Sequence, residues 1–127
     1  QALPARLYKL YDGLNILINR IHPSVVAIEA PFVHKNVRAA MAVGQAQAIA
    51  MVAAAYHELE TFSYAPSQVK RAVTDYGGSS KTQVHEMVRV QLGLPDEWTA
   101  YPDAADALAV AICHASANRV EDLLIQD

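Results

Sequence analysis

The sequence predicts an α/β fold, and two observations carry this prediction. Short segments rich in β-branched and aromatic residues alternate with helical segments, in the order helix, strand, helix, strand and then three helices. This order is typical of parallel strands joined by crossover helices. The chain has 127 residues, 53% of them hydrophobic, which is enough for a core of its own. We therefore expect a single α/β domain over residues 1–127.

The first two elements are an amphipathic helix and an apolar strand. Leucine and isoleucine recur at helical spacing over residues 3–21, and Pro23 ends the pattern. The segment SVVAIEA (24–30) has no polar–apolar alternation, which is typical of a strand buried on both faces, and Pro31 closes it.

The middle of the chain predicts a helix and a second strand. Residues 36–57 form a helical pattern in which alanine and glycine recur, and such small residues allow another helix or a sheet to approach closely. The segment TFSYA (61–65) favours a short strand because it contains aromatic and β-branched residues.

Three helices are predicted after the second strand. The segment 66–78 starts with a proline and ends with paired glycines, which are helix start and stop signals. Ser80 opens a helix that runs to Gly93, and residues 95–102 form a loop. The final helix begins near Asp103 and runs to about Leu124.

Two strands make an underbuilt sheet, since a two-stranded sheet is seldom stable by itself. A strand that is apolar on both faces needs neighbouring strands and covering helices. The chain also begins with Gln rather than Met. We expect at least one further strand before Gln1, either absent from this chain or supplied by another one.

The composition favours a reduced, intracellular protein. Cys113 is the one cysteine, which excludes an internal disulfide, and its apolar surroundings indicate packing rather than reactivity. We find no pattern of a secretory signal or a membrane span. The net charge of −3 is unevenly spread, because residues 95–127 hold seven acids against Arg119 alone. Basic residues gather in Lys35–Arg38 and in Lys70, Arg71 and Lys81.

Three carboxylates stand out by position. Asp103 and Asp106 are three apart on one helix face, so their like charges lie close together in an alanine-rich run. Glu29 ends the apolar strand, where α/β proteins bind ligands. Oxygen ligands of this kind suit Mg²⁺ or Mn²⁺. Two alternatives stay open: Asp103 caps the helix or complements its dipole, and Glu29 is a solvated residue at a strand end.

Four segments together resemble the RuvC family of bacterial Holliday-junction resolvases. They are AIEAPF (27–32), VGQAQAIAMVAA (43–54), YAPSQVKRAVTDYGGSSKTQV (64–84) and DAADALAVAICH (103–114). The resemblance implies an RNase H-like fold, with a central mixed sheet flanked by helices, that is truncated here at its N-terminus. It also implies a homodimer that cuts four-way DNA junctions with two Mg²⁺ ions, or Mn²⁺, in each active site.

The resemblance assigns roles to individual residues. Catalytic roles fall on Glu29, Asp103, Asp106 and Lys81, of which the three carboxylates are also the metal ligands; DNA contacts fall on Phe32, Lys70, Arg71 and Arg38. The family's fourth carboxylate lies in a GIDPG-like first strand that has no counterpart here. His114 resembles a position near the family's active site, and we interpret it as structural.

Partners and alternatives follow from the same resemblance. The small-residue helix 36–57 fits the family's dimer contact, and the RuvA–RuvB branch-migration complex is a possible partner in the bacterial cytoplasm. One alternative is a non-catalytic DNA-binding or dimerisation fragment, because the first catalytic Asp is absent. Another is an RNase H-like nuclease that acts on a different nucleic acid, which the DAAD pair and the spacing of Lys70 and Lys81 disfavour.

Overall fold

The computed structural model of the chain describes residues 1–30 and 36–125. Its elements are α1 (Leu3–Ile21), β1 (Val25–Glu29), α2 (Val37–Tyr56), β2 (Glu60–Tyr64), α3 (Pro66–Thr74), α4 (Lys81–Leu92), the 3₁₀ helix η1 (Asp96–Ala100) and α5 (Pro102–Ile125). This order confirms the predicted succession of helices and strands. Contacts within the chain gather into two compact units, Gln1–Ser63 and Tyr64–Asp127.

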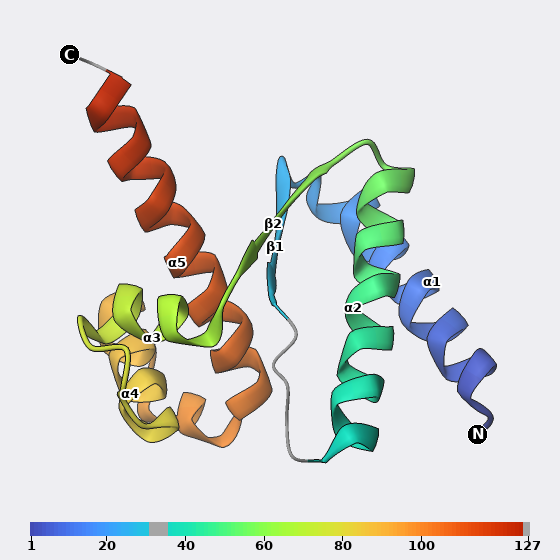
Figure 1. The fold of residues 1–127 in the computed structure, drawn as a ribbon, viewed down its shortest axis with the longest axis horizontal. Coiled ribbons are helices and arrows are strands. Elements are labelled where there is room, and N and C mark those ends of the chain that lie inside the picture. The colour runs from blue at the N-terminus through green and yellow to red at the C-terminus, as the bar shows by residue number, and fades with distance from the viewer. Residues whose placement is uncertain (31–35, 126–127) are drawn as a thin grey trace. The chain divides into compact units, whose positions relative to one another are not determined.

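In the first unit α1 and α2 lie side by side, and β1 pairs with β2 in a two-stranded sheet (Figure 1). The half-buried positions of α1 include Leu7, Leu14 and Ile18, which share one helix face. Leu10 and Leu17, which belong to the same predicted apolar pattern, are exposed. Only part of that pattern is therefore used for packing within the described chain.

The strand β1 is less buried than its composition predicts. Ile28 is its one buried residue, and the other four are half-buried. A strand that is apolar on both faces is buried only when strands and helices cover it on both sides. In the described residues β1 has β2 as its one neighbouring strand, so the burial expected on both faces is reached only at Ile28.

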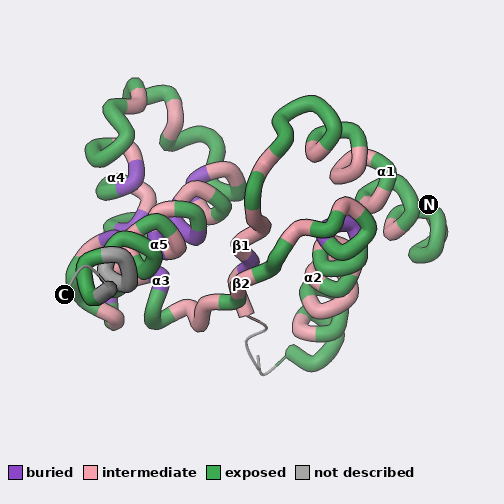
Figure 2. The backbone as a smooth tube through the Cα atoms, turned by 90° about the horizontal axis from the view of Figure 1, so that it is seen from above, coloured by how far each residue is buried: buried purple, intermediate pink, exposed green. Residues whose placement is uncertain are grey.

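The second unit holds most of the core. The helices α3 and α4 and the short η1 pack around the first half of α5 (Figure 1), and buried segments mark this contact in Figure 2. The buried apolar side chains of this unit are Val69, Val73, Val84, Val88, Ala105, Ala109, Val110 and Cys113. Burial raises the pKa of the Cys113 thiol, in agreement with a packing role.

Local signals explain where the helices of this unit begin and end. A capping box of Ser80 and Gln83 starts α4, and Gly93 ends it in the left-handed conformation at φ 64°. The paired glycines do not end α3 directly. Asp75 takes the left-handed conformation at φ 68° after Thr74, since Asp tolerates this region better than most residues. The predicted loop 95–102 contains η1.

The helix α2 keeps an apolar, exposed face. Val37, Met41, Val52 and Tyr56 are all more than half exposed although they are large and apolar. The helix has 20 residues and is, by length and composition, apolar enough to cross a membrane, a test that the core helix of a soluble protein also passes. Within the part of the chain that the structure describes, this face of α2 is left uncovered.

A candidate acidic and basic cluster

Asp106 is the centre of the most organised polar cluster in the second unit. It lies in the first turns of α5, and its side chain is 34% exposed. Its Oδ1 lies 2.7 Å from Nε2 of His85, and its Oδ2 lies 3.1 Å from Nζ of Lys81. Both carboxylate oxygens are therefore held from α4, which packs against α5.

Lys81 and His85 reach Asp106 together because they are four residues apart on one face of α4. The capping box at Ser80 fixes the first turn of this helix and so the position of Lys81. The two partners differ in exposure: the side chain of Lys81 is 69% exposed and that of His85 is 17% exposed. Lys81 can move into solvent, whereas His85 is held by its surroundings.

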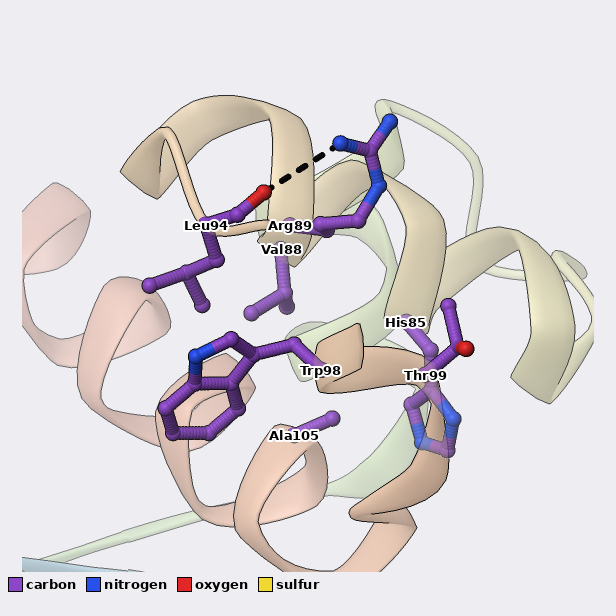
Figure 3. A pocket seen from close by; sticks show the side chains of 7 residues that line it. All are labelled: His85, Val88, Arg89, Leu94, Trp98, Thr99 and Ala105. Atoms are coloured by element: carbon purple, nitrogen blue, oxygen red, sulfur yellow. Dashed lines mark hydrogen bonds between the residues drawn. The ribbon is translucent and has the colours of Figure 1, made fainter. Parts of the chain in front are cut away.

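The surroundings of His85 include a small pocket (Figure 3). It is lined by His85, Val88, Arg89, Leu94, Trp98, Thr99 and Ala105. Figure 3 shows the indole of Trp98 between Leu94 and Ala105, and Nη1 of Arg89 donates to the Leu94 carbonyl at 3.3 Å. The lining is mainly apolar, which indicates packing of η1 against α4 rather than a polar ligand site.

Asp103 lies one turn before Asp106 and is exposed. Since α5 already starts at Pro102, Asp103 lies inside the first turn rather than before the helix as a cap would. Its charge there complements the positive end of the helix dipole. Among the described residues it makes no hydrogen bond or ion pair, so its carboxylate oxygens are available to a ligand.

Glu29 is the last residue of β1 and belongs to the first unit. Its backbone carbonyl accepts a short hydrogen bond from Nε2 of Gln47, which fixes the strand end to α2. The Oε1 of Gln47 is buried and finds no donor among the described residues. Glu29 itself is half-buried, rather than fully solvated as the alternative interpretation requires.

The predicted DNA contacts that lie among the described residues differ in exposure. Arg38 and Arg71 are exposed, and Lys70 is half-buried on α3. The guanidinium of Arg71 lies against the loop at Gly77, where an added Cβ would come within 3.3 Å of Nη2. Phe32 lies outside the described residues.

The chemistry of the donor set fits a hard divalent cation. Asp103 and Asp106 present carboxylate oxygens within one turn of each other, and such cations prefer oxygen ligands. Among the described residues, no three His, Cys, Asp or Glu side chains form a group that could by itself hold a metal ion. Within the described residues the aspartate pair therefore supplies only two carboxylates toward such a site.

Sequence reasoning missed His85. The histidines show no ligand spacing in the sequence, and His85 became visible only through its contact with Asp106. Its position four residues after Lys81 was the one available signal. For His114 the prediction of a structural residue agrees with the contacts, because its Nδ1 lies 2.6 Å from the hydroxyl of Tyr64.

Comparison with known proteins places these residues in a family context. The family profile described as "Crossover junction endodeoxyribonuclease RuvC" matches residues 1–114. A protein of that name from Chloroflexus aggregans is 48% identical over 117 residues, covering 88% of this chain and 68% of the relative. One from Dehalococcoides mccartyi is 45% identical over 124 residues, covering 98% and 74%.

Solved structures give the same result for the fold. The structure described as "T. thermophilus RuvC in complex with Holliday junction substrate" matches with a TM-score of 0.82 at 31% identity, covering 95% of this chain and 73% of that chain. The structure described as "Thermus thermophilus RuvC structure" matches with a TM-score of 0.79 over 95% and 72% of the two chains. The predicted RNase H-like α/β fold is thereby confirmed.

Proposed function

The chain belongs to the RuvC family of crossover junction endodeoxyribonucleases, and from this premise we propose that it resolves four-way (Holliday) DNA junctions by metal-assisted hydrolysis of phosphodiester bonds. The observation that carries the proposal is the contact of Asp106 with Lys81. It places a carboxylate that can bind a metal ion beside an ammonium group that can bind a phosphate. A relative solved with a junction substrate supports this choice of DNA.

The carboxylates of Glu29, Asp103 and Asp106 would hold Mg²⁺, or Mn²⁺ in its place, with two ions in each site. When bound, such a pair activates a water molecule and stabilises the leaving oxygen of a phosphodiester. Without cations, Asp103 and Asp106 repel each other across one helical turn, and part of this repulsion is removed by Lys81.

Lys81 has a second role at the phosphate. Its amine is largely exposed and can leave Asp106 for a phosphate oxygen on which negative charge develops. Water attack on phosphorus with loss of the 3′ oxygen leaves a 5′-phosphate and a 3′-hydroxyl, and these ends can be religated. Lys81 would leave Asp106 before the attack, once the phosphate is in place, so that the carboxylate is free of its ion pair and could bind the cation.

Other residues bind and orient the junction. Lys70, Arg71 and Arg38 contact the DNA backbone, where cationic side chains supply affinity that does not depend on sequence. Phe32 is assigned to stacking on a base near the junction centre, an interaction that an aromatic ring can offer to any base. These contacts remain useful in a non-catalytic DNA-binding fragment, which is the alternative function.

A homodimer accounts for the exposed apolar face of α2. This face is formed by Val37, Met41, Val52 and Tyr56. When two copies of the chain pack together around a two-fold axis, each copy covers this face of the other. A two-fold dimer suits a four-way junction because it presents two sites for symmetric cuts. We further propose that the protein acts in the bacterial cytoplasm and is able to work beside the RuvA–RuvB complex.

Cleavage of a synthetic four-way junction with Mg²⁺ tests the proposal. We compare the chain as it is with the chain preceded by a strand that carries the family's first aspartate. The extended chain is expected to cut, and Asp106→Asn is expected to abolish cutting while junction binding in a gel-shift assay persists, because one metal ligand is lost. Undiminished cutting by Asp106→Asn would remove this residue from the mechanism.

The matched control is Asp96→Asn, an acid on η1 whose side chain is 95% exposed and which lies outside the proposed ligand set. It is expected to cut as the unsubstituted protein does. Junction binding without any cutting by the extended chain would favour the non-catalytic alternative.

A further inference from the structure

We propose that His85 is a positioning residue for the metal site: it donates a hydrogen bond to Asp106 and holds this carboxylate in the orientation that binds the cation. This inference rests on the proposed function, because it assigns a purpose to the partner of a proposed ligand. It starts from the 2.7 Å contact between Nε2 of His85 and Oδ1 of Asp106.

The direction of this hydrogen bond follows from its partners. An ionised carboxylate only accepts hydrogen bonds, so the hydrogen must lie on Nε2 of His85. Hydrogen bonds with one charged partner are stronger than neutral ones. A carboxylate oxygen has more than one lone pair, so Oδ1 can accept from His85 while Asp106 binds a cation.

His85 rather than Lys81 is suited to this task because of its burial. Its side chain is 17% exposed against 69% for Lys81, so less side-chain entropy is lost when the contact forms. When Lys81 turns to a phosphate, Asp106 loses one of its two partners on α4. His85 is the partner that stays and keeps the carboxylate from rotating into solvent.

The packing around the ring explains why His85 stays. Val84 and Val88, its neighbours on α4, are buried, and the ring borders the pocket that Trp98 and Ala105 complete (Figure 3). A side chain fixed by packing and by one hydrogen bond is what orients a metal ligand from behind. Such partners act on metal affinity rather than on DNA affinity.

Two substitutions separate the hydrogen bond from the packing. His85→Phe keeps an aromatic ring in the same place but cannot donate. His85→Gln gives up the ring but carries an amide N–H that can reach about as far as Nε2. The matched control is His57→Phe, because Nε2 of His57 makes a similar contact of 2.8 Å with Asn15 Oδ1 in the first unit.

The readout is Mn²⁺ binding by the full chain, followed through the electron paramagnetic resonance signal of free Mn²⁺, together with junction binding without metal. His85→Phe is expected to weaken Mn²⁺ binding by about 10- to 100-fold, the usual effect of losing such a partner. His85→Gln is expected to recover most of this loss. His57→Phe is expected to leave Mn²⁺ binding unchanged, and junction binding is expected to persist in all three.

Three results would overturn the inference. Unchanged Mn²⁺ binding in His85→Phe, or equal loss in both His85 variants, means that the hydrogen bond does not matter. An Nδ1–H tautomer for His85, measured by nitrogen-15 NMR on the unsubstituted chain, excludes the donation whether or not the variants fold.

Asp106→Asn in the same titration separates the two proposals. If it retains full Mn²⁺ affinity, the proposed function fails and the inference fails with it. If it loses affinity while His85→Phe does not, only the inference about His85 fails.

Discussion

Asp106 is a residue at which a requirement of folding meets the proposed function. A partly buried carboxylate beside another acid is costly unless partners offset its charge. Here Lys81 and His85 supply that compensation in the folded chain. The same two contacts are those proposed to prepare Asp106 as a metal ligand, since the side chain of Lys81 is largely exposed and that of His85 is largely buried.

Glu86 and Arg89 form a second, simpler ion pair on α4. Nε and Nη2 of Arg89 donate to the two carboxylate oxygens of Glu86 at 3.1 and 2.6 Å. This bidentate hydrogen bond lowers the pKa of Glu86, and the charge of Arg89 adds to the effect. Both side chains border solvent, so their contribution to stability is small.

The lowered pKa of Glu86 gives a pH prediction with a definite sign. A carboxyl group whose pKa is lowered in the folded chain stabilises folding at pH values above its ordinary pKa. This contribution is lost as the pH falls through the lowered pKa. Glu86→Gln is therefore expected to be slightly less stable than the unsubstituted chain at neutral pH, and the difference is expected to vanish in acid. Urea unfolding at pH 7 and at successively lower pH measures it.

A difference that grows toward acid would contradict this account. Thr82→Ser, at an exposed position on the same helix, is the control and is expected to show no such pH dependence.

Among the helices and strands, α2 leads to the clearest prediction about assembly. Its exposed apolar face is proposed to bury itself against a second copy, so a charge placed there opposes association. Val52→Glu is expected to turn the dimer into a monomer without loss of helix content, measured by analytical ultracentrifugation and circular dichroism.

Ile16→Glu is the matched control for α2, because Ile16 lies on α1 and is 51% exposed, close to the 54% of Val52. It is expected to leave the oligomeric state unchanged. Dimers that persist in Val52→Glu, or a chain that is monomeric before substitution, would contradict the proposed contact.

The elements that were predicted best from the sequence are those whose ends are determined by residues within one helical turn. Ser80 and Gly93 determine both ends of α4 through local hydrogen bonds and a left-handed residue, and the predicted bounds agree with the structure. The end of α3 was less predictable, because Asp75 rather than a glycine takes the left-handed conformation. The 3₁₀ helix after Pro95 was predicted as a loop, since one short turn carries little periodic signal.

For the molecule as a whole, the features that could not be predicted from the sequence are contacts between residues that lie far apart along the chain. The sequence placed Asp103 and Asp106 on one helix face from their spacing alone, and the structure agrees. It could not place His85 against Asp106, 21 residues away, because that contact depends on how α4 packs on α5. The burial of β1 likewise depends on which strands surround it.

Asp103 and Asp106, which lie within one turn of each other at the start of α5, are proposed to bind the same divalent cations. Mn²⁺ broadens the NMR signals of nuclei close to it, so a titration with substoichiometric Mn²⁺ tests this proposal directly. Backbone amides of residues 103–107 are expected to broaden, and those of α1 are expected to stay sharp. Signals of residues 103–107 that stay sharp would contradict a metal site at this pair and with it the proposed nuclease mechanism.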